Sequence, residues 1–339
     1  MTAFESKELG EKKIVHNSEL TSTFKQVVEP YTGGSPQDEQ KVWTSLRPKE
    51  IQDKLESKGF TVSYYIAAEL LKDSGLKKRS YLKKATMGKP YALRNDQFEK
   101  IACIKEFFLQ QGFPVWSIDT KKKELIGNFH RSGHYYDSSP RQVNDHDFES
   151  FAKGKIVPHG IYDLAQNTGY ITLGNSKDTS EFVCDNIANY WLEYGQWNYT
   201  DSEWILLLCD GGGSNNARHY IVKQDFCKLA KKIQMNLLVA HYPPYCSKYN
   251  PIEHRLFAHL HHAWDGAVLS SVQIAKELAE KTSTKTGLST FVNINSNQYL
   301  TKRPVCEKFK SNIKTIIEFD EKIPLLNYAI RHENVQLIF

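Results

Sequence analysis

The stretch that decides the fold spans residues 241–260 and reads HYPPYCSKYNPIEHRLFAHL. An apolar run, MNLLVA at 235–240, precedes it and predicts a short buried strand. The two prolines that follow end this strand, because proline cannot donate a backbone N–H. A helical pattern begins at Pro251, a residue that suits a first helical turn, with Asn250 as a candidate N-cap. Glu253 lies in that turn, where a carboxylate either compensates the helix dipole or serves as a metal ligand.

Two further carboxylates lie at the ends of predicted buried strands. VWSIDT at 115–120 contains Asp119 near its end, and WILLLCDGGGSN at 204–215 contains Asp210 directly after its apolar run. Strand ends of an α/β sheet converge on a site at one edge. Three carboxylates that meet there repel one another unless a cation neutralises them. The sequence therefore predicts a cation site formed by Asp119, Asp210 and Glu253.

The contexts of the three carboxylates resemble the catalytic triad of DDE transposases with a ribonuclease-H-like fold. These contexts are IDTKKKELIGNF, CDGGGSN and PPYCSKYNPIEHRLF. The family that they resemble is the Rhodopirellula-type DDE transposase family of bacterial insertion sequences, and the last context is also similar to mariner-type transposases, which share the fold. The resemblance runs from about residue 28 to about residue 299 and includes VEPYTGG (28–34), VPHGIYDLAQNTGYITLG (157–174), DTSEFV (178–183) and TSTKTGL (282–288).

This resemblance implies a reaction. Asp119, Asp210 and Glu253 would be the catalytic residues and would hold two Mg²⁺ ions, which Mn²⁺ can replace, with Asp119 bridging both ions. Two such ions can bind the attacking and leaving oxygens of a phosphodiester together. The implied protein is a DNA transposase that binds the ends of its element, hydrolyses a phosphodiester bond there and joins the 3′ ends to target DNA by transesterification. Its implied partners are double-stranded DNA, as terminal repeats and as target, and a second or further copy of itself.

The order of the apolar segments predicts the fold class. The chain reads as three strands, helix, strand, helix, strand, helix, which predicts an α/β fold with a ribonuclease-H-like mixed sheet and flanking helices. In that fold the first and fourth strands are neighbours. We expect four regions: a polar N-terminal arm (1–41), a helix-turn-helix domain with a basic tail (42–95), the catalytic domain (96–268) and a C-terminal extension (269–339), whose last part (313–339) has no functional interpretation.

Residues 44–76 predict the helix-turn-helix. The helical patterns RPKEIQDKLESKG and YYIAAELLKDSG meet at a glycine turn, with Thr44 or Ser45 capping the first helix and Ser63 the second. Between residues 72 and 94 lie eight basic residues and one acidic residue, a patch that phosphate contacts need. An ordinary αα-hairpin with a solvated linker is the alternative. The candidate DNA contacts here are Ser63, Tyr64, Tyr65, Lys72, Lys77, Lys78 and Arg79.

Polar residues around the predicted catalytic site are further candidates. Lysines and arginines near strand ends contact phosphate in some proteins and are only solvated in others, and the sequence leaves both interpretations open. The DNA-contact candidates are Lys121, Lys122, Asn215, Arg255 and Lys285. Four histidines at 254–262 invite a zinc interpretation, but the segment supplies no further ligands of zinc-like spacing, so we do not expect a zinc site.

Composition sets the class and the compartment. The chain has 339 residues, 40% of them hydrophobic, which supports a packed core; its net charge of +5 is a mild excess that says little by itself. We see no apolar run long enough to span a membrane, no secretory signal, and no CxxC among the six cysteines. We therefore expect an intracellular protein, in the cytoplasm or on the nucleoid, that is neither secreted nor bound to a membrane.

Two other functions compete with the transposase. A catalytically idle or domesticated derivative would bind DNA without cutting it; the short N-terminus and the divergent C-terminus favour this alternative, and the complete triad disfavours it. A different nuclease of the same fold would cut RNA–DNA hybrids or Holliday junctions. The predicted helix-turn-helix disfavours that nuclease, because structure-selective nucleases need no base-reading element.

Overall fold

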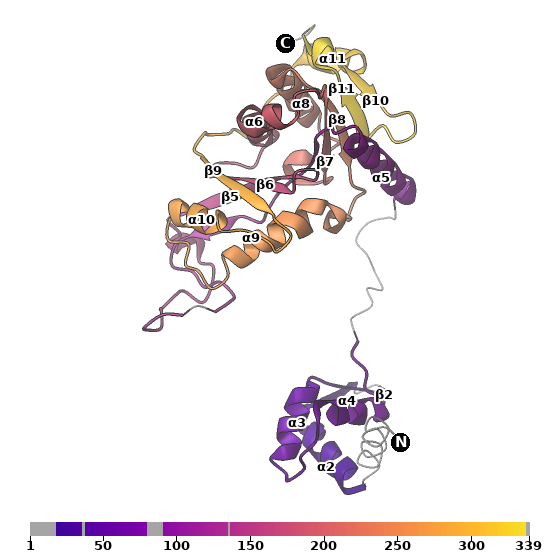
Figure 1. The fold of residues 1–339 in the computed structure, drawn as a ribbon, viewed down its shortest axis with the longest axis vertical. Coiled ribbons are helices and arrows are strands. Elements are labelled where there is room, and N and C mark those ends of the chain that lie inside the picture. Colours follow the sequence, from indigo (N-terminus) through magenta and orange to yellow (C-terminus); the bar gives the residue numbers. More distant parts are fainter. Residues whose placement is uncertain (1–17, 36–37, 80–90, 135, 337–339) are drawn as a thin grey trace. The chain divides into compact units, whose positions relative to one another are not determined.

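The computed structural model describes residues 18–35, 38–79, 91–134 and 136–336 (Figure 1). The chain forms two compact units, residues 1–88 and residues 89–339, and each is described by itself. Among the helices that the structure describes, none combines the length and the apolar surface that a bilayer-spanning segment needs.

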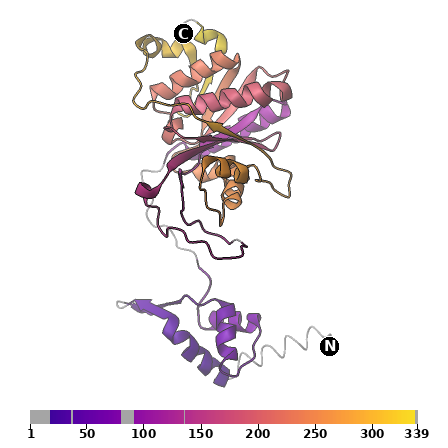
Figure 2. The same ribbon diagram turned by 90° about the vertical axis from the view of Figure 1, so that its left-hand side faces the viewer.

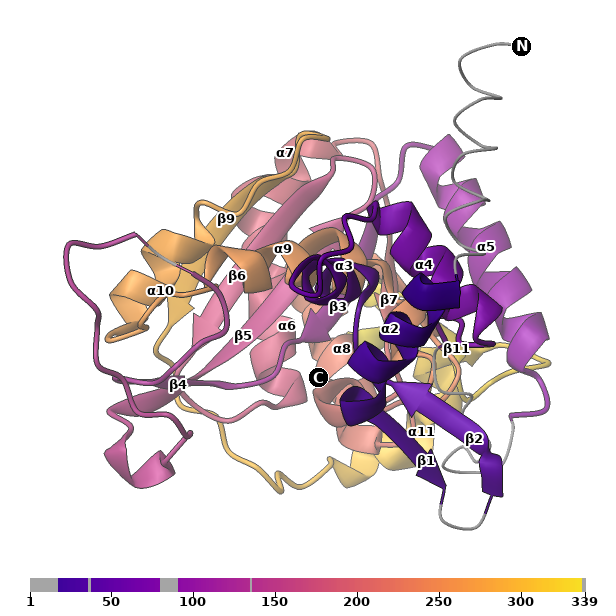
Figure 3. The same ribbon diagram turned by 90° about the horizontal axis from the view of Figure 1, so that it is seen from below.

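The described residues of the N-terminal unit form three α-helices and a two-stranded antiparallel hairpin (Figure 3). Leu20 and Phe24 of the first helix pack with Ile51, Leu55 and Leu70 of the other two in one apolar core. The first helix lies within the residues predicted as a polar arm, so that part of the chain contributes to the core of this unit. The elements are α2 (Ser18–Val28), η1 (Glu29–Tyr31), β1 (Thr32–Ser35), β2 (Asp38–Thr44), α3 (Pro48–Glu56) and α4 (Tyr64–Asp73).

Specific residues determine where α3 and α4 begin and end. Ser63 Oγ accepts the N–H of Ile66 at 3.3 Å, so Ser63 caps α4 as predicted. The predicted cap of α3 is wrong, because Arg47 occupies the N-cap position and the Glu50 carboxylate accepts the Arg47 N–H at 2.7 Å. Gly59, in the turn between the two helices, has φ +89°, which glycine adopts without strain. A DNA-reading role for α3 and α4 stays a prediction.

The second unit is built on a nine-stranded mixed sheet in the described part of the chain. Its strands lie in the order β10-β11-β8-β7-β3-β5-β6-β9, with β4 paired to β5 beside this path. The central strand β7, WILLLC, is an unbroken apolar run, as expected of a parallel strand covered on both faces. The strands are β3 (Val115–Thr120), β4 (Glu124–Ile126), β5 (Gly154–Asp163), β6 (Thr168–Gly174), β7 (Trp204–Cys209), β8 (Asn236–His241), β9 (Ser289–Asn295), β10 (Ile317–Phe319) and β11 (Asn327–Ile330).

Helices cover both faces of this sheet. One face packs against α6 and α8, and the other packs against α5 and against the helices between η6 and α10 (Figures 1 and 2). The helices are α5 (Arg94–Gln110), α6 (Ser180–Tyr190), α7 (Gln196–Asn198), α8 (Tyr220–Ile233), α9 (Ala258–Ala263), α10 (Val272–Ala279), α11 (Glu307–Ile316) and α12 (His332–Val335). The π-helical segments are η3 (Trp191–Gly195) and η6 (Glu253–Phe257), and the 3₁₀ turns are η2 (Glu149–Phe151), η4 (Gly213–Asn215) and η5 (Ser247–Tyr249).

This topology confirms the predicted fold class of the core. β3 and β7 are parallel neighbours, β5 is antiparallel to β3 and β6, and α6 and α8 provide the crossovers that parallel strands require. The region predicted as an extension also joins the sheet. β9 pairs with β6 at one edge, and the β10–β11 hairpin pairs with β8 at the other.

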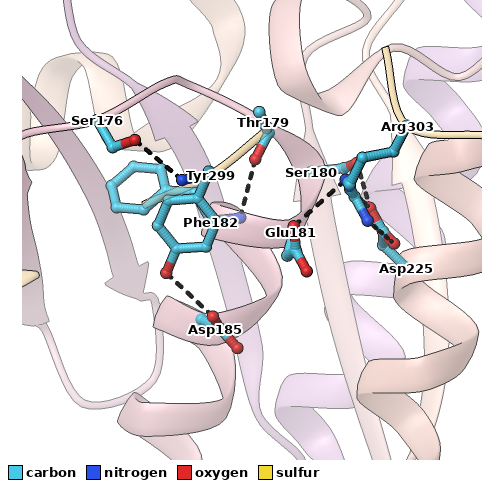
Figure 4. Close-up of polar contacts among 9 residues, drawn as sticks. All are labelled: Ser176, Thr179, Ser180, Glu181, Phe182, Asp185, Asp225, Tyr299 and Arg303. Carbon is cyan, nitrogen blue, oxygen red and sulfur yellow. Dashed lines mark hydrogen bonds and ion pairs between the residues drawn. The ribbon is translucent and has the colours of Figure 1, made fainter. Parts of the chain in front are cut away.

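The segment between β9 and α11 is bonded to the α6–α8 layer (Figure 4). Arg303 donates to both carboxylate oxygens of Asp225 on α8, and Ser180 at the start of α6 donates to the same carboxylate. Tyr299, in the same segment, donates to Asp185 at 3.0 Å. We call Ser180, Asp225 and Arg303 the Arg303 clamp.

Candidate active site

Strand pairing brings Asp119 and Asp210 together. Ile118 of β3 pairs with Cys209 of β7 in the parallel register. Asp119 is the next residue of β3, and Asp210 is the first residue after β7. The two carboxylates therefore follow paired residues at one edge of the sheet.

Asp119 and Asp210 also share a face of the sheet. Successive residues of a strand alternate between its two faces. Trp116 and Ile118 of β3, and Cys209 of β7, pack in the core beneath α6 and α8. The two carboxylates alternate with these residues, so they lie on the opposite face, the one that carries the helix of Glu253.

Glu253 comes to this region at the start of a helix. β8 ends at His241, and the chain passes through a loop to η6, whose first residue is Glu253. Ser117 of β3, two residues before Asp119, accepts the N–H of Ile252 at 3.0 Å. The residue before Glu253 is thus bonded to the strand that contains Asp119.

Burial and neighbouring carboxylates raise the pKa of Asp119 and the pKa of Asp210. Burial raises the pKa of the Asp119 carboxyl, and the nearby charge of Asp210 raises it further. Glu253 and Asp178 act in the same direction, whereas the Thr120 N–H, which donates to Asp119 Oδ1 at 2.7 Å, lowers this pKa. Burial also raises the pKa of Asp210, again with contributions from Glu253 and Asp178. A cation between these carboxyls would oppose both shifts, because an opposite charge favours the ionised form.

The donor set fits a hard divalent cation. Mg²⁺ takes oxygen ligands, and Asp210 Oδ1 is a buried oxygen without a hydrogen-bond partner in the described structure. Buried carboxylate oxygens normally have such a partner, so this oxygen is available as a ligand. As placed, however, no three His, Cys, Asp or Glu side chains of the described residues are grouped so that they could hold a metal ion. The structure therefore places carboxylates suited to Mg²⁺ at the ends of β3 and β7, but it does not group three of the described carboxylates into a complete coordination shell.

Asp178 is a carboxylate at this site to which sequence reasoning assigned no role. Thr120 Oγ1, next to Asp119, donates to Asp178 Oδ1 at 3.2 Å. The sequence feature that could have indicated Asp178 is the N-cap pattern directly after it. Thr179 Oγ1 accepts the Phe182 N–H at 3.3 Å and begins α6, which places Asp178 just before a helix that packs beside β3.

Comparison with known proteins identifies the chain's family. Residues 23–332 match the family described as the Rhodopirellula transposase DDE domain. The chain belongs to this family. The match spans most of the 339 residues and confirms the family predicted from the sequence. No curated protein matches the chain.

Solved structures similar to this member of the DDE-domain family are complexes of the Mos1 transposase. The Mos1 paired-end complex with the left transposon end has a TM-score of 0.40 and 16% identity over 69% of this chain. The Mos1 mariner paired-end complex with Mn has a TM-score of 0.41 and 17% identity, also over 69% of this chain. In both comparisons this chain covers 65% of the length of the Mos1 chain.

Two predicted DNA contacts of this DDE-domain protein have largely buried side chains. Lys121 forms an ion pair with Glu124 at 2.9 Å, and only 13% of its side chain is exposed. Asn215 is 1% exposed, and its backbone carbonyl lies 3.0 Å from the Nε2 atom of the buried His241 ring. A buried amide cannot contact DNA in this conformation, so the structure does not support the prediction for Asn215. The exposed candidates in this unit are Lys122, Arg255 and Lys285.

The candidates in the N-terminal unit lie mostly on its surface. Tyr64 and Tyr65 are exposed on the first turn of α4. The hydroxyl of Ser63 accepts the capping hydrogen bond, and Lys72 pairs with Glu69 at 2.9 Å. The remaining basic candidates of this unit are all exposed: Lys77, Lys78 and Arg79.

Proposed function

We propose that the protein is a metal-dependent DNA transposase that cleaves the ends of its element and joins them to target DNA. Membership of the transposase family supports this proposal, and one observation of the structure carries it. Asp119 and Asp210 follow paired residues of neighbouring parallel strands and lie on the face that carries the helix of Glu253. No serine or histidine nucleophile is required for such a reaction.

The three carboxylates have one task in this proposal. Asp119, Asp210 and Glu253 would hold divalent cations, Mg²⁺ or Mn²⁺, with two ions per site. When bound, such ions stabilise the negative charge of a phosphoryl transition state and lower the pKa of water and of a 3′-hydroxyl. Burial and neighbouring carboxylates raise the pKa of Asp119 and of Asp210, and a bound cation would oppose both shifts, so cation binding would favour the ionised forms.

The surroundings of the site favour a large anionic substrate. Three glycines, residues 211–213, follow Asp210, and they carry no side chains that would cover it. Lys122 and Arg255 are exposed and close in sequence to Asp119 and Glu253. We propose that these two residues and Lys285 contact DNA phosphates in this unit, and that Tyr64, Tyr65 and the basic residues after α4 contact the ends of the element. A dimer or larger assembly would hold two ends together.

One experiment tests the proposal. Purified protein is incubated with MgCl₂ or MnCl₂ and with DNA that carries the end of its element, in parallel with Asp210→Asn and with DNA of scrambled end sequence. We expect metal-dependent nicking at the end that the substitution reduces by at least about 100-fold, because the charge that holds the cation is lost. Nicking that Asp210→Asn leaves intact would refute the proposal, and nicking that ignores the end sequence would indicate a different nuclease of this fold.

A second candidate is a DNA-binding derivative without catalytic activity. The observation that favours it is the lack of a closed metal-ligand group among the described residues. In the same experiment this candidate predicts a specific shift of end DNA in a gel and no nicking with either metal.

A further inference from the structure

Ser117 and Asn250 form a buried connection between β3 and the loop before η6. Both side chains are fully buried. Ser117 Oγ donates to Asn250 Oδ1 at 2.5 Å, and Asn250 Nδ2 donates to the carbonyl of Ile118 at 3.2 Å. Ser117 Oγ also accepts the N–H of Ile252 at 3.0 Å. We call Ser117 and Asn250 the Ser117–Asn250 bracket.

The bracket differs from an ordinary helix cap. The sequence predicts that Asn250 caps the helix behind it, but its side chain bonds β3 instead. The cap is supplied by Ser117, whose hydroxyl accepts an N–H of the first turn from a different element of the fold. The bonds lie within two residues of Asp119 on one side and within three of Glu253 on the other. The bracket thus joins the carriers of two proposed metal ligands directly.

A glycine allows the helix to approach the sheet closely enough for these bonds. Gly160 of β5 is the partner of Asp119 across the antiparallel β3–β5 pair. A Cβ atom at Gly160 would lie 2.6 Å from the Phe257 ring and 2.8 Å from Ile252 Cδ1. The helix that begins with Glu253 therefore packs directly against the backbone of β5 at the residue paired with Asp119.

The loop alone does not fix Glu253. The chain from the end of β8 to η6 turns through Tyr245, which has φ +62°, and through the short turn η5. Tyr245 is exposed, and Tyr249, also at the surface, packs against Phe98 of α5 with ring centroids 5.1 Å apart, which holds the middle of the loop but not its junction with Glu253. The two residues that anchor this loop to β3 next to Glu253 are both uncharged, so they hold the helix without adding charge beside carboxylates that already repel.

We infer that the Ser117–Asn250 bracket positions Glu253 against Asp119 and thereby sets the affinity of the site for a divalent cation. This inference rests on the proposed function. Ser117 and Asn250 are positioning residues and do not contact the cation. Groups that orient metal ligands without contacting the metal typically contribute about 10–100-fold to metal affinity. A ligand displaced by about 1 Å lowers activity to a comparable degree.

The test compares bracket variants with matched controls. Asn250→Ala and Ser117→Ala remove the bracket. Asn295→Ala removes a buried amide that bonds Asn186 and Tyr299 on the α6 side of the sheet, and Ser180→Ala removes the hydroxyl of the Arg303 clamp (Figure 4). Ser117→Thr keeps a hydroxyl at position 117. For each full-length variant we measure the Kd for Mn²⁺ alone by calorimetry, the Mn²⁺-induced shift in Tm, and the Mn²⁺ concentration that gives half-maximal nicking.

We expect Asn250→Ala and Ser117→Ala to raise the Kd for Mn²⁺ by about 10-fold or more. The two control variants should keep Kd within about twofold, and Ser117→Thr should restore most of the affinity. Bracket variants that bind Mn²⁺ as the wild type does would overturn the inference and leave the proposed function intact. Equal losses of affinity in bracket and control variants would also overturn it, because the effect would then be general destabilisation. A wild-type protein that binds no Mn²⁺, like Asp210→Asn, would overturn the proposed function and this inference together.

Discussion

Two helix starts beside the candidate site are anchored by different chemistry. The start of α6 is held by the Arg303 clamp, in which a guanidinium and a hydroxyl share one buried carboxylate. The helix of Glu253 is held by the Ser117–Asn250 bracket, which consists of neutral hydrogen bonds. The charged anchor lies between α6 and α8, whereas the neutral anchor lies on the face that Asp119 and Asp210 share.

The difference has a physical reason. Electrostatic interactions are strong in a buried environment of low dielectric constant, so a charged anchor next to the carboxylates would shift their pKa values and compete for their oxygens. Hydrogen bonds between a hydroxyl, an amide and the backbone hold position without a net charge. The four predictions below test this contrast, in order of decreasing expected effect.

Breaking the charged anchor should cause the largest loss of stability. Arg303→Ala leaves the Asp225 carboxylate, whose side chain is 4% exposed, without its counter-charge, and we expect a loss of about 3–5 kcal/mol in the free energy of unfolding. Urea unfolding measures this loss. Glu181→Ala is the matched control, because Glu181 also pairs with Arg303, at 3.3 Å, but its side chain is 44% exposed and should contribute less than about 1 kcal/mol. Equal effects of the two variants would show that the buried pair is not the anchor.

Adding a methyl group beneath the helix of Glu253 should cause the second-largest effect. Gly160→Ala places a methyl group against Phe257 and Ile252, and overpacking of this kind costs about 1–3 kcal/mol. We also expect nicking to fall more than the lost stability explains, because the helix start moves away from Asp119. Gly154→Ala on the same strand is the control, since a Cβ atom there meets nothing within 4 Å. Nicking that is unchanged in Gly160→Ala would show that the close approach is not needed.

Lowering the pH should destabilise the α6 side of the sheet before it destabilises the side that carries the Ser117–Asn250 bracket. His159 of β5 lies against Phe182 of α6, and burial lowers the pKa of His159 to about 3. An unfolded histidine titrates near 6.5, so this contribution to stability is complete above pH 6.5. It falls by about 1.4 kcal/mol for each pH unit below that value, down to the folded pKa. Ser117 and Asn250 do not titrate in this range.

Hydrogen exchange at pH 7 and pH 5 measures the acid effect. We expect α6 to lose more protection than η6 at pH 5. His159→Leu should reduce the dependence of stability on pH, and substitution of the exposed His146 by Gln should not. Protection that falls equally in both helices would remove this distinction between the two sides.

Removing the hydroxyl of one outer side chain on the α6 side, Tyr299, should have the smallest effect. Tyr299→Phe loses the hydrogen bond to Asp185 at 3.0 Å and the one from Asn295 at 2.8 Å, and we expect a loss of about 1 kcal/mol, measured as a fall in Tm. Tyr136→Phe, at a fully exposed position, should change nothing. A loss as large as that of Arg303→Ala would mean that the tyrosine, and not the clamp, anchors this segment.

Much of the central sheet follows from the sequence. Continuous apolar runs predict β3, β7 and β8, and the intervening helical patterns predict α6 and α8. The outer strands could not be predicted from the sequence. The β11 segment, NYAI, is too short and too mixed in polarity to indicate a strand, and it becomes one because β8 offers an unpaired edge. Such pairing is decided by tertiary contacts, and no local pattern encodes it.

The candidate site shows the same limit. Asp119, Asp210 and Glu253 can be proposed from strand ends and a helix start. The partners of Asn250 could not be predicted. An asparagine directly before a helix that begins with proline has the pattern of an N-cap, and this pattern is the same when the side chain bonds a strand instead. Asp178 was missed because the capping pattern at Thr179 predicts only that a helix begins there, whereas the packing of α6 on β3 brings the preceding residue to the site.

The position of β11 in the chain has a consequence for biosynthesis. The edge of β8 is covered by residues 327–330, so the strand that leads toward Glu253 gains its second neighbour only after almost every other part of the sheet has left the ribosome. The N-terminal helices can fold far earlier, since domains form in order during translation. A nascent chain would therefore complete its N-terminal unit well before the sheet that carries Asp119 and Asp210 gains its last strands.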